Sequence, residues 1–206
     1  MKIITLDIKD LYINLPIQGI IRTTKFWLNK NINDNGLIKQ TLYMLKTIMK
    51  QNYFQYNERL FQPEKGIAMG SLISSIMAEV YLWYIQETYV KQWLDSKEIT
   101  YYKRYVDDIL IIYDQNKTNE QTILHQINKI DKNLQFKMST EENNTINYLD
   151  ISVHRNDDNM DISIYRKPTC TDITIQFSSN HPYEHKIPAF RYYIHRMITL
   201  PITEKS

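Results

Sequence analysis

Cysteine, glycine, proline and long apolar runs are all scarce in this sequence. It has one cysteine, Cys170, among 206 residues. One thiol excludes a disulfide-stapled fold and a Cys/His zinc cluster. Four glycines and six prolines indicate mostly regular secondary structure. The most apolar stretch, residues 73–85, contains Ser74, Ser75 and Glu79 and is shorter than the ~18 residues that a membrane span needs.

The first 16 residues carry Asp7 and Asp10 in an otherwise apolar run, which excludes a secretory signal. We therefore expect a soluble intracellular protein. Charge is balanced overall, at +2, but unevenly spread. Residues 22–65 hold eight basic and three acidic side chains, whereas residues 95–161 hold eight basic and thirteen acidic ones. An enzyme that binds both nucleic acid and cations would show this split, and so would many ordinary surfaces.

Hydrophobic periodicity predicts an alternation of strands and helices. The expected strands are residues 2–8, 53–56, 59–62, 99–106, 109–114, 135–139, 146–153 and 161–166. The expected helices are residues 17–28, 37–50, 71–94, 117–134 and 182–200. This order predicts an α+β domain on a largely antiparallel sheet, with a boundary near residues 166–168 that separates a small C-terminal piece.

Three aspartates stand out against their surroundings. Asp107 and Asp108 lie between two β-prone runs, where a hairpin turn would ordinarily use Asn-Gly or Asp-Gly. Adjacent like charges cost free energy unless a cation or a basic group compensates. Asp7 ends an apolar strand, where aspartate is rare. A solvated turn and a helix cap are the ordinary interpretations of these positions.

If the first strand pairs beside the hairpin of residues 105–112, the three carboxylates converge. Oxygen-ligated divalent cations, Mg²⁺ above all, need such an arrangement. Two metal ions about 4 Å apart, held by carboxylates, form the clamp for in-line phosphoryl displacement. We therefore expect the Asp7 and Asp107 carboxylates to lie within about 6 Å of each other.

Three strings carry a family resemblance. TLDIKDLYINLP at 5–16, GIAMGS at 66–71 and YVDD at 105–108 resemble motifs A, B and C of reverse transcriptases in type, order and spacing. Each string alone is a weak signal, but the three together in strand, loop–helix and hairpin contexts are a strong one.

The C-terminal half narrows the resemblance to one group. NYLDISVHR at 147–155, YRKPTCTD at 165–172 and SSNHPYEHK at 178–186 are similar to the thumb-proximal signature of Penelope-like retroelement reverse transcriptases. The LY-x-N-x-P form of the first motif, residues 11–16, is similar as well. Telomerase-type and retroviral enzymes share the first three motifs but lack the Arg-Lys-Pro-Thr and His-Pro strings.

The resemblance implies a metal site. Asp7 and Asp107 would bind two catalytic Mg²⁺ ions, with Mn²⁺ as an alternative ion. Asp108 would assist, and the backbone carbonyl of Ile8 would be a further ligand.

It also implies a nucleotide site. Tyr12 would be the gate whose ring collides with a ribose 2′-hydroxyl, and Asp10 of the same motif would belong to the site. Met69 and Gly70 would pack on the incoming nucleotide and its template base, where a missing Cβ allows close approach. Lys137 would approach the triphosphate, as the lysine of the family's motif D loop does. Tyr12 as a core aromatic and Met69 as core filler are the alternatives.

Nucleic-acid contacts are expected mainly in the C-terminal part. Tyr105 would lie under the primer end. Phosphate contacts are expected from five basic side chains, Arg166, Lys167, His181, Lys186 and Arg191. The aromatic residues between them would stack on bases or sugars. An amphipathic helix over 188–198 that simply packs on the rest of the domain is the alternative.

For the fold, the resemblance implies a right-hand polymerase palm over residues 1–165, a ferredoxin-like antiparallel sheet with helices on one face. Residues 166–206 would begin the thumb. The family's fingers region precedes motif A and is not within these residues. A fingers-containing partner or a lost upstream region would have to supply it.

For the function, the resemblance implies an RNA-directed DNA polymerase fragment that adds dNTPs to a primer 3′-hydroxyl. Its partners would be an RNA template, a DNA primer and dNTPs, with no membrane, in the nucleus. A catalytically inactive, nucleic-acid-binding remnant is the alternative. A palm-like nucleotide cyclase is remote, because its Gly-Gly-x-x-Phe hairpin is missing.

Overall fold

The computed structural model describes residues 1–156, 159–171 and 173–200. The chain divides into two compact units, Met1–Thr140 and Glu141–Ser206. The described strands after residue 140 pair only with one another, so the compact division comes before the sequence boundary expected near 166–168. The assignment of residues 1–165 to a palm and of 166–206 to a thumb stays a prediction.

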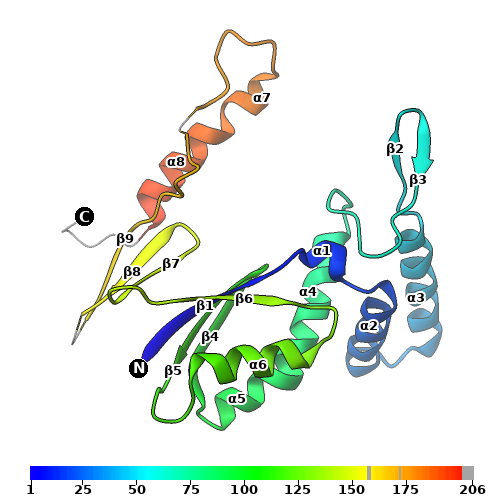
Figure 1. Ribbon diagram of the computed structural model, residues 1–206. Coiled ribbons are helices and arrows are strands. Elements are labelled where there is room, and N and C mark those ends of the chain that lie inside the picture. The colour runs from blue at the N-terminus through cyan, green and yellow to red at the C-terminus, as the bar shows by residue number, and fades with distance from the viewer. Residues whose placement is uncertain (157–158, 172, 201–206) are drawn as a thin grey trace. The chain divides into compact units, whose positions relative to one another are not determined.

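A four-stranded antiparallel sheet forms the centre of unit 1 (Figure 1). Its order is β4 (Ile99–Tyr105), β5 (Asp108–Tyr113), β1 (Lys2–Ile8) and β6 (Phe136–Thr140). The first strand of the chain therefore lies between the two strands of this sheet that are most distant from it in sequence. With a helix after β1 and another after β5, this order is that of the β-α-β-β-α-β ferredoxin-like arrangement. The predicted α+β, antiparallel architecture is confirmed.

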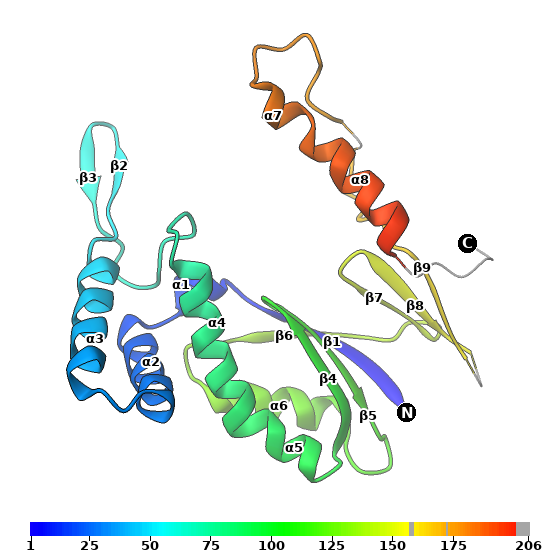
Figure 2. The same ribbon diagram turned by 180° about the vertical axis from the view of Figure 1, so that it is seen from behind.

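The helical elements of unit 1 are α1 (Leu11–Asn14), α2 (Ile17–Asn31), α3 (Asn35–Lys50), α4 (Ser74–Ile85), the π-helical turn η1 (Gln86–Val90), α5 (Lys91–Asp95) and α6 (Glu120–Ile130). Helices α4, α5 and α6 lie along one face of the sheet in both views (Figures 1 and 2). Side-chain caps begin two of the helices: Asp34 accepts from two backbone N–H groups of α3, and Asn119 from the N–H of Thr122.

The helical run predicted from Ser71 to about Leu94 is confirmed over Ser74–Asp95, with two differences. The helix starts at Ser74 and is interrupted by the π-helical turn before α5. A π turn holds one residue more than an α turn. Ile85 and Val90, five residues apart, are both buried, so the wider turn keeps the apolar face directed at the core.

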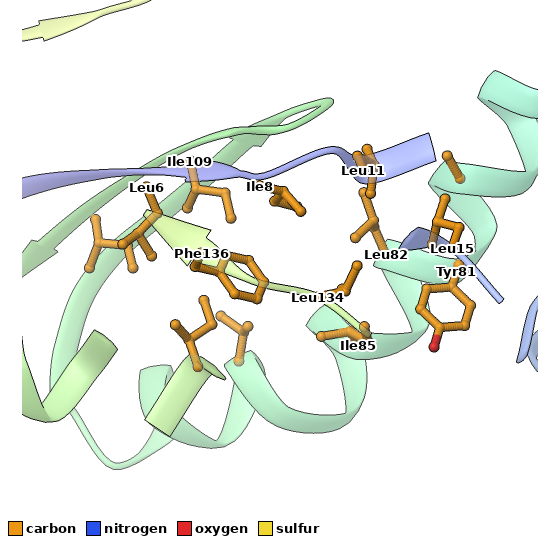
Figure 3. Close-up of a cluster of buried hydrophobic side chains, with 14 of the residues drawn as sticks. Leu6, Ile8, Leu11, Leu15, Tyr81, Leu82, Ile85, Ile109, Leu134 and Phe136 are labelled. Carbon is orange, nitrogen blue, oxygen red and sulfur yellow. The ribbon is translucent and has the colours of Figure 1, made fainter. Parts of the chain in front are cut away.

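The hydrophobic core fills the space between the sheet and these helices. Leu6 and Ile8 of β1 point from the sheet into the same buried cluster as Leu82 of α4 (Figure 3). Ile109 of β5 and Phe136 of β6 join them. Burial of one such side chain contributes about 1.5–3 kcal/mol. Because side chains alternate along a strand, burying these residues directs their neighbours to the opposite face.

A small hairpin follows α3, as predicted. It consists of β2 (Phe54–Tyr56) and β3 (Arg59–Phe61). The two residues between the strands, Asn57 and Glu58, have φ values of 46° and 61°. Two consecutive left-handed residues are typical of the type I′ turn that connects tight hairpins.

Unit 2 contains a three-stranded antiparallel sheet and two helices. Its elements are β7 (Thr145–Tyr148), β8 (Ile151–Arg155), β9 (Met160–Ile164), α7 (Tyr183–Lys186) and α8 (Pro188–Thr199). Among the described residues of the chain, no helix combines the length and apolarity needed to cross a membrane.

Two predictions in this unit are corrected. The run 146–153, predicted as one strand, is a hairpin because Leu149 adopts a left-handed φ of 54° and the chain reverses there. The run 182–200, predicted as one helix, divides before Pro188. Proline lacks an N–H and suits the first turn of a helix, so α8 begins at this residue.

Candidate active site

Four side chains form a row across the four strands of the unit 1 sheet. Tyr105 of β4 lies opposite Asp108 of β5. Asp7 of β1 lies between Asp108 on one side and Lys137 of β6 on the other. Residues directly opposed in antiparallel strands share a face, with Cα atoms about 4.5–5.5 Å apart. Leu6 next to Asp7 is buried beneath the sheet, so the row lies on the face away from the helices.

A tight turn carries the third aspartate. Val106 and Asp107 connect β4 to β5, and Val106 has a φ of 53°. A β-branched residue in this region costs about 1–3 kcal/mol and persists only where the surroundings hold it. The Val106 side chain packs against the core, and the Ile8 N–H donates to the Asp107 carbonyl at 3.1 Å. These contacts fix Asp107 beside the end of β1.

The carboxylates fit a divalent cation in chemical type, since hard oxygen donors are what Mg²⁺ prefers. Asp7 is exposed, and Asp107 and Asp108 are half-buried. In the part of the chain that the structure describes, no three His, Cys, Asp or Glu side chains are gathered closely enough to hold a metal ion. The structure thus brings the three aspartates together through the backbone of β1 and the hairpin, without a closed ligand cluster.

Arg104 lies beneath this turn, and sequence analysis did not identify it. Its Nη1 donates to Glu79 Oε1 at 2.8 Å and to the Val106 carbonyl at 3.0 Å, and its Nη2 donates to Glu79 Oε2 at 2.9 Å. Burial lowers the pKa of the Arg104 guanidinium, but the hydrogen bonds and charge of Glu79 outweigh burial and raise that pKa. A basic residue at an inward position of a strand was the available signal.

The segment after β1 is locked to the loop before α4. Tyr12 is half-buried against the core, and its carbonyl accepts from the Ile67 N–H at 2.8 Å. Gly66 has a φ of +82°, and a Cβ there would lie 2.5 Å from the Ile13 carbonyl oxygen. Only glycine fits so close a backbone approach. Asp10, exposed and at a φ of 50°, precedes α1.

Met69 and Gly70 are presented outward by the same loop. Met69 is 68% exposed, so it is not core filler. A Cβ at Gly70 would meet nothing within 4 Å, so the fold itself does not require glycine there. Gly70 lines a cavity of about 370 Å³ between the end of α3 and the start of α4, with Tyr53 and Ser74 on its wall. The loop backbone is therefore open to a ligand.

The predicted phosphate-binding residues belong to unit 2. Arg166 and Lys167 are exposed just after β9, and Arg191 is exposed on α8. His181 is also exposed, with its Nδ1 3.2 Å from Ser179 Oγ. These four side chains are accessible to solvent, as contact with nucleic acid requires.

Lys186 differs from them. Its Nζ donates to the carbonyls of Phe177 and Ser179, each at 2.6 Å, and lies 5.4 Å from the centre of the Phe177 ring. These contacts tie the preceding loop to α7. Lys186 therefore has a structural role in unit 2, whether or not a phosphate also contacts it.

The structure resembles solved telomerases. Apo telomerase from Candida tropicalis superposes with a TM-score of 0.61 at 14% identity, over 74% of this chain and 31% of that chain. The C. tropicalis enzyme in complex with a TWJ fragment of telomeric RNA superposes with a TM-score of 0.61 at 14% identity, over 84% of this chain and 32% of that chain. The corresponding Candida albicans complex superposes with a TM-score of 0.57 at 14% identity, over 78% of this chain and 31% of that chain. The chain thus spans about a third of the structures it matches, and these identities show a shared fold only.

Among curated proteins, no sequence matches the chain. A family-wide match does cover most of it: residues 2–147 fit the family described as reverse transcriptase (RNA-dependent DNA polymerase). The matched range includes the Asp7 strand, the Gly66 loop and the Asp107 turn. Reverse transcriptases are nucleotidyltransferases that bind nucleic acids and typically use divalent metals. With most of its length inside that match, the chain belongs to the reverse transcriptase (RNA-dependent DNA polymerase) family.

Proposed function

We propose that this chain is the palm and the start of the thumb of a Penelope-like reverse transcriptase, which adds dNTPs to a primer 3′-hydroxyl on an RNA template. The observation that carries the proposal is the row of Tyr105, Asp108, Asp7 and Lys137 on the sheet face away from the unit 1 helices. It combines two opposed carboxylates with a flanking cation and an aromatic ring. The strings at 147–155, 165–172 and 178–186 support the Penelope-like subtype.

The aspartates would hold the two Mg²⁺ ions, Asp7 and Asp107 as ligands of both and Asp108 in support. When bound, the ions lower the pKa of the attacking 3′-hydroxyl and stabilise the leaving pyrophosphate. The Ile8 carbonyl, next to the N–H that pairs with Asp107, would complete the oxygen donors.

Other residues would place the substrates. Tyr105, exposed at the end of β4, supports the primer terminus, and Lys137 binds the triphosphate. Tyr12 and Asp10, which follow β1, line the sugar side of the nucleotide. Met69 and Gly70 contact the base through the open loop. The phosphates of the RNA–DNA duplex are held by five basic side chains, Arg166, Lys167, His181, Lys186 and Arg191. The proposed location of the reaction is the nucleus.

The decisive experiment is primer extension by residues 1–206 joined to the fingers region of a family member. The template is RNA, the primer DNA, and Mg²⁺ or Mn²⁺ is supplied. We expect dNTP addition that is lost in Asp107→Asn and kept in Asp95→Asn, an exposed aspartate at the end of α5. Extension that survives Asp107→Asn would contradict the assignment.

A non-catalytic, nucleic-acid-binding remnant is the second candidate. The absence of a closed three-ligand cluster among the described residues favours it. The same experiment separates the two, because a remnant binds the duplex and extends nothing even when fingers are supplied.

A further inference from the structure

The guanidinium of Arg104 joins two segments that carry different motifs. The Arg104 side chain is only 8% exposed and lies on the helix side of β4, below the Val106–Asp107 turn. It forms a bidentate ion pair with Glu79 of α4 and also donates to the Val106 carbonyl. Helix α4 follows the Gly66 loop, so one side chain connects that helix to the turn that carries Asp107.

Stability alone does not explain this arrangement. The Arg104 Nε is buried and has no hydrogen-bond partner among the described residues, which costs free energy. The Glu79 side chain is 51% exposed, and an ion pair that solvent reaches contributes only about 0–1 kcal/mol to stability. The pair is therefore a device for fixing geometry more than for raising the free energy of unfolding.

The geometry that it fixes is the peptide between Val106 and Asp107. Val106 has a left-handed φ of 53°, so this peptide would relax if its carbonyl were released. The carbonyl belongs to the peptide plane directly before the Asp107 Cα. Rotation of that plane changes the φ of Asp107, one of the two backbone angles on which the direction of its Cα–Cβ bond depends.

The geometry points to Arg104 as a positioning residue, which directs the Asp107 carboxylate by holding the Val106 carbonyl and couples that direction to α4 through Glu79. This inference rests on the proposed function. Arg104 contacts no substrate; it acts through the turn.

The test uses the double variant Glu79→Met/Arg104→Met, which removes the donors without leaving a buried unpaired charge. Arg104→Lys retains one cationic donor group, and Glu87→Met/Lys91→Met, which removes one charge of each sign at exposed positions, is the matched control. Thermal unfolding of residues 1–206 is measured first. We expect the double variant to melt within a few degrees of wild type.

Two readouts then report on Asp107. Mn²⁺ binding to residues 1–206, followed by electron paramagnetic resonance, should weaken at least about fivefold in the double variant. In the fingers-joined protein, the rate of single-nucleotide addition should fall about 10²-fold, as expected for a small misplacement at the reacting centre. Half-saturation by dNTP should change by less than about twofold, since no contact with the nucleotide is lost. Arg104→Lys should recover part of the rate.

The outcomes are distinguishable. A folded double variant with wild-type Mn²⁺ affinity and rate, beside an active wild type, overturns the positioning role alone. A double variant that loses rate only in proportion to its unfolded fraction overturns it as well. A wild-type protein that neither binds Mn²⁺ nor extends a primer contradicts the proposed function and the inference with it.

Discussion

Asp7 of β1 and Asp108 of β5 are directly opposed on neighbouring strands, on the sheet face away from the helices. Like charges directly opposite each other on neighbouring strands destabilise a sheet. Lys137, opposite Asp7 on its other side, is the only basic residue in that cross-strand row. Two directly opposed carboxylates are an arrangement that a cation-dependent reaction would use.

Removing the charge of Asp107 should separate chemistry from binding. In the fingers-joined protein we expect Asp107→Asn to lower primer extension at least about 10²–10³-fold, the usual effect of losing one charge-stabilising group. Affinity for an RNA–DNA duplex should stay equal or rise, because a negative charge near the phosphates is lost. Gel extension and a salt titration of binding measure the two quantities. Equal losses of extension and of binding would refute a catalytic role.

Tyr12 should control the choice of sugar. Tyr12→Ala is expected to raise incorporation of rNTP relative to dNTP, because it removes the ring that would meet the 2′-hydroxyl. Tyr43→Ala, at a 74% exposed position on α3, serves as the control. The measurement is the ratio of single-nucleotide addition rates for rNTP and dNTP. An unchanged ratio would show that Tyr12 does not select the sugar and that its role is packing against the core.

Substitution of two glycines in one loop should affect stability differently. Gly66→Ala is expected to lower the free energy of unfolding by at least about 2 kcal/mol, because of a positive φ and a close contact with the Ile13 carbonyl. Gly70→Ala should leave unfolding unchanged, since its Cβ has open space, and should weaken nucleotide binding. Urea denaturation and dNTP half-saturation measure the pair. Equal stability losses would show that the close approach at Gly66 does not matter.

Tyr81 should make unit 1 sensitive to alkaline pH. Burial, together with the hydrogen bond that Tyr81 donates to Asp131, raises the pKa of its hydroxyl above the usual value near 10. Because the pKa is raised in the folded state, the stabilisation that the protonated Tyr81 hydroxyl provides is complete below pH 10. It is lost as the pH rises through the folded-state pKa. Tyr81→Phe should cost about 1–2 kcal/mol at pH 7 and flatten the loss of stability above pH 10. Tyr84→Phe is the control. If the stability of Tyr81→Phe depended on pH in the same way as that of the wild type, the prediction would be contradicted.

Lys167 and Lys186 should have different roles in unit 2. Residues 1–206 alone are expected to bind an RNA–DNA duplex weakly and in a salt-sensitive way, with negligible extension. Lys167→Met should reduce the slope of log affinity against log salt by about one, the signature of one phosphate contact. Lys186→Met should lower the melting temperature, because its two carbonyl contacts are lost. If Lys186→Met changed the salt slope and not the melting temperature, its structural role would be wrong.

Much of the candidate site was readable from local sequence. The YVDD string between two β-prone runs predicted the hairpin, and the apolar run of residues 2–8 predicted the strand that ends beside it. Both patterns depend on contacts between residues close in sequence. The roles of the aspartates came from resemblance, and they stay predictions.

Other features could not be read locally. A π-helical turn differs from an α-helix by a single residue, so periodicity over 71–94 indicated one helix. The hairpin at Leu149 depends on a left-handed backbone that leucine seldom adopts. Gly66 and Gly70 look alike in sequence, and only the contact with the Ile13 carbonyl distinguishes them.

The sequence by itself determined the residue types of the site and the approximate ranges of the helices and strands that carry them. Only the tertiary structure decided that β1 lies between β5 and β6, so that Asp7 meets Asp108 and Lys137. It also decided that Arg104 reaches Glu79, 25 positions earlier in the chain. The physical reason is that local periodicity reports which side of an element avoids water. The choice of partner is made by long-range pairing and packing, which no short stretch of sequence contains.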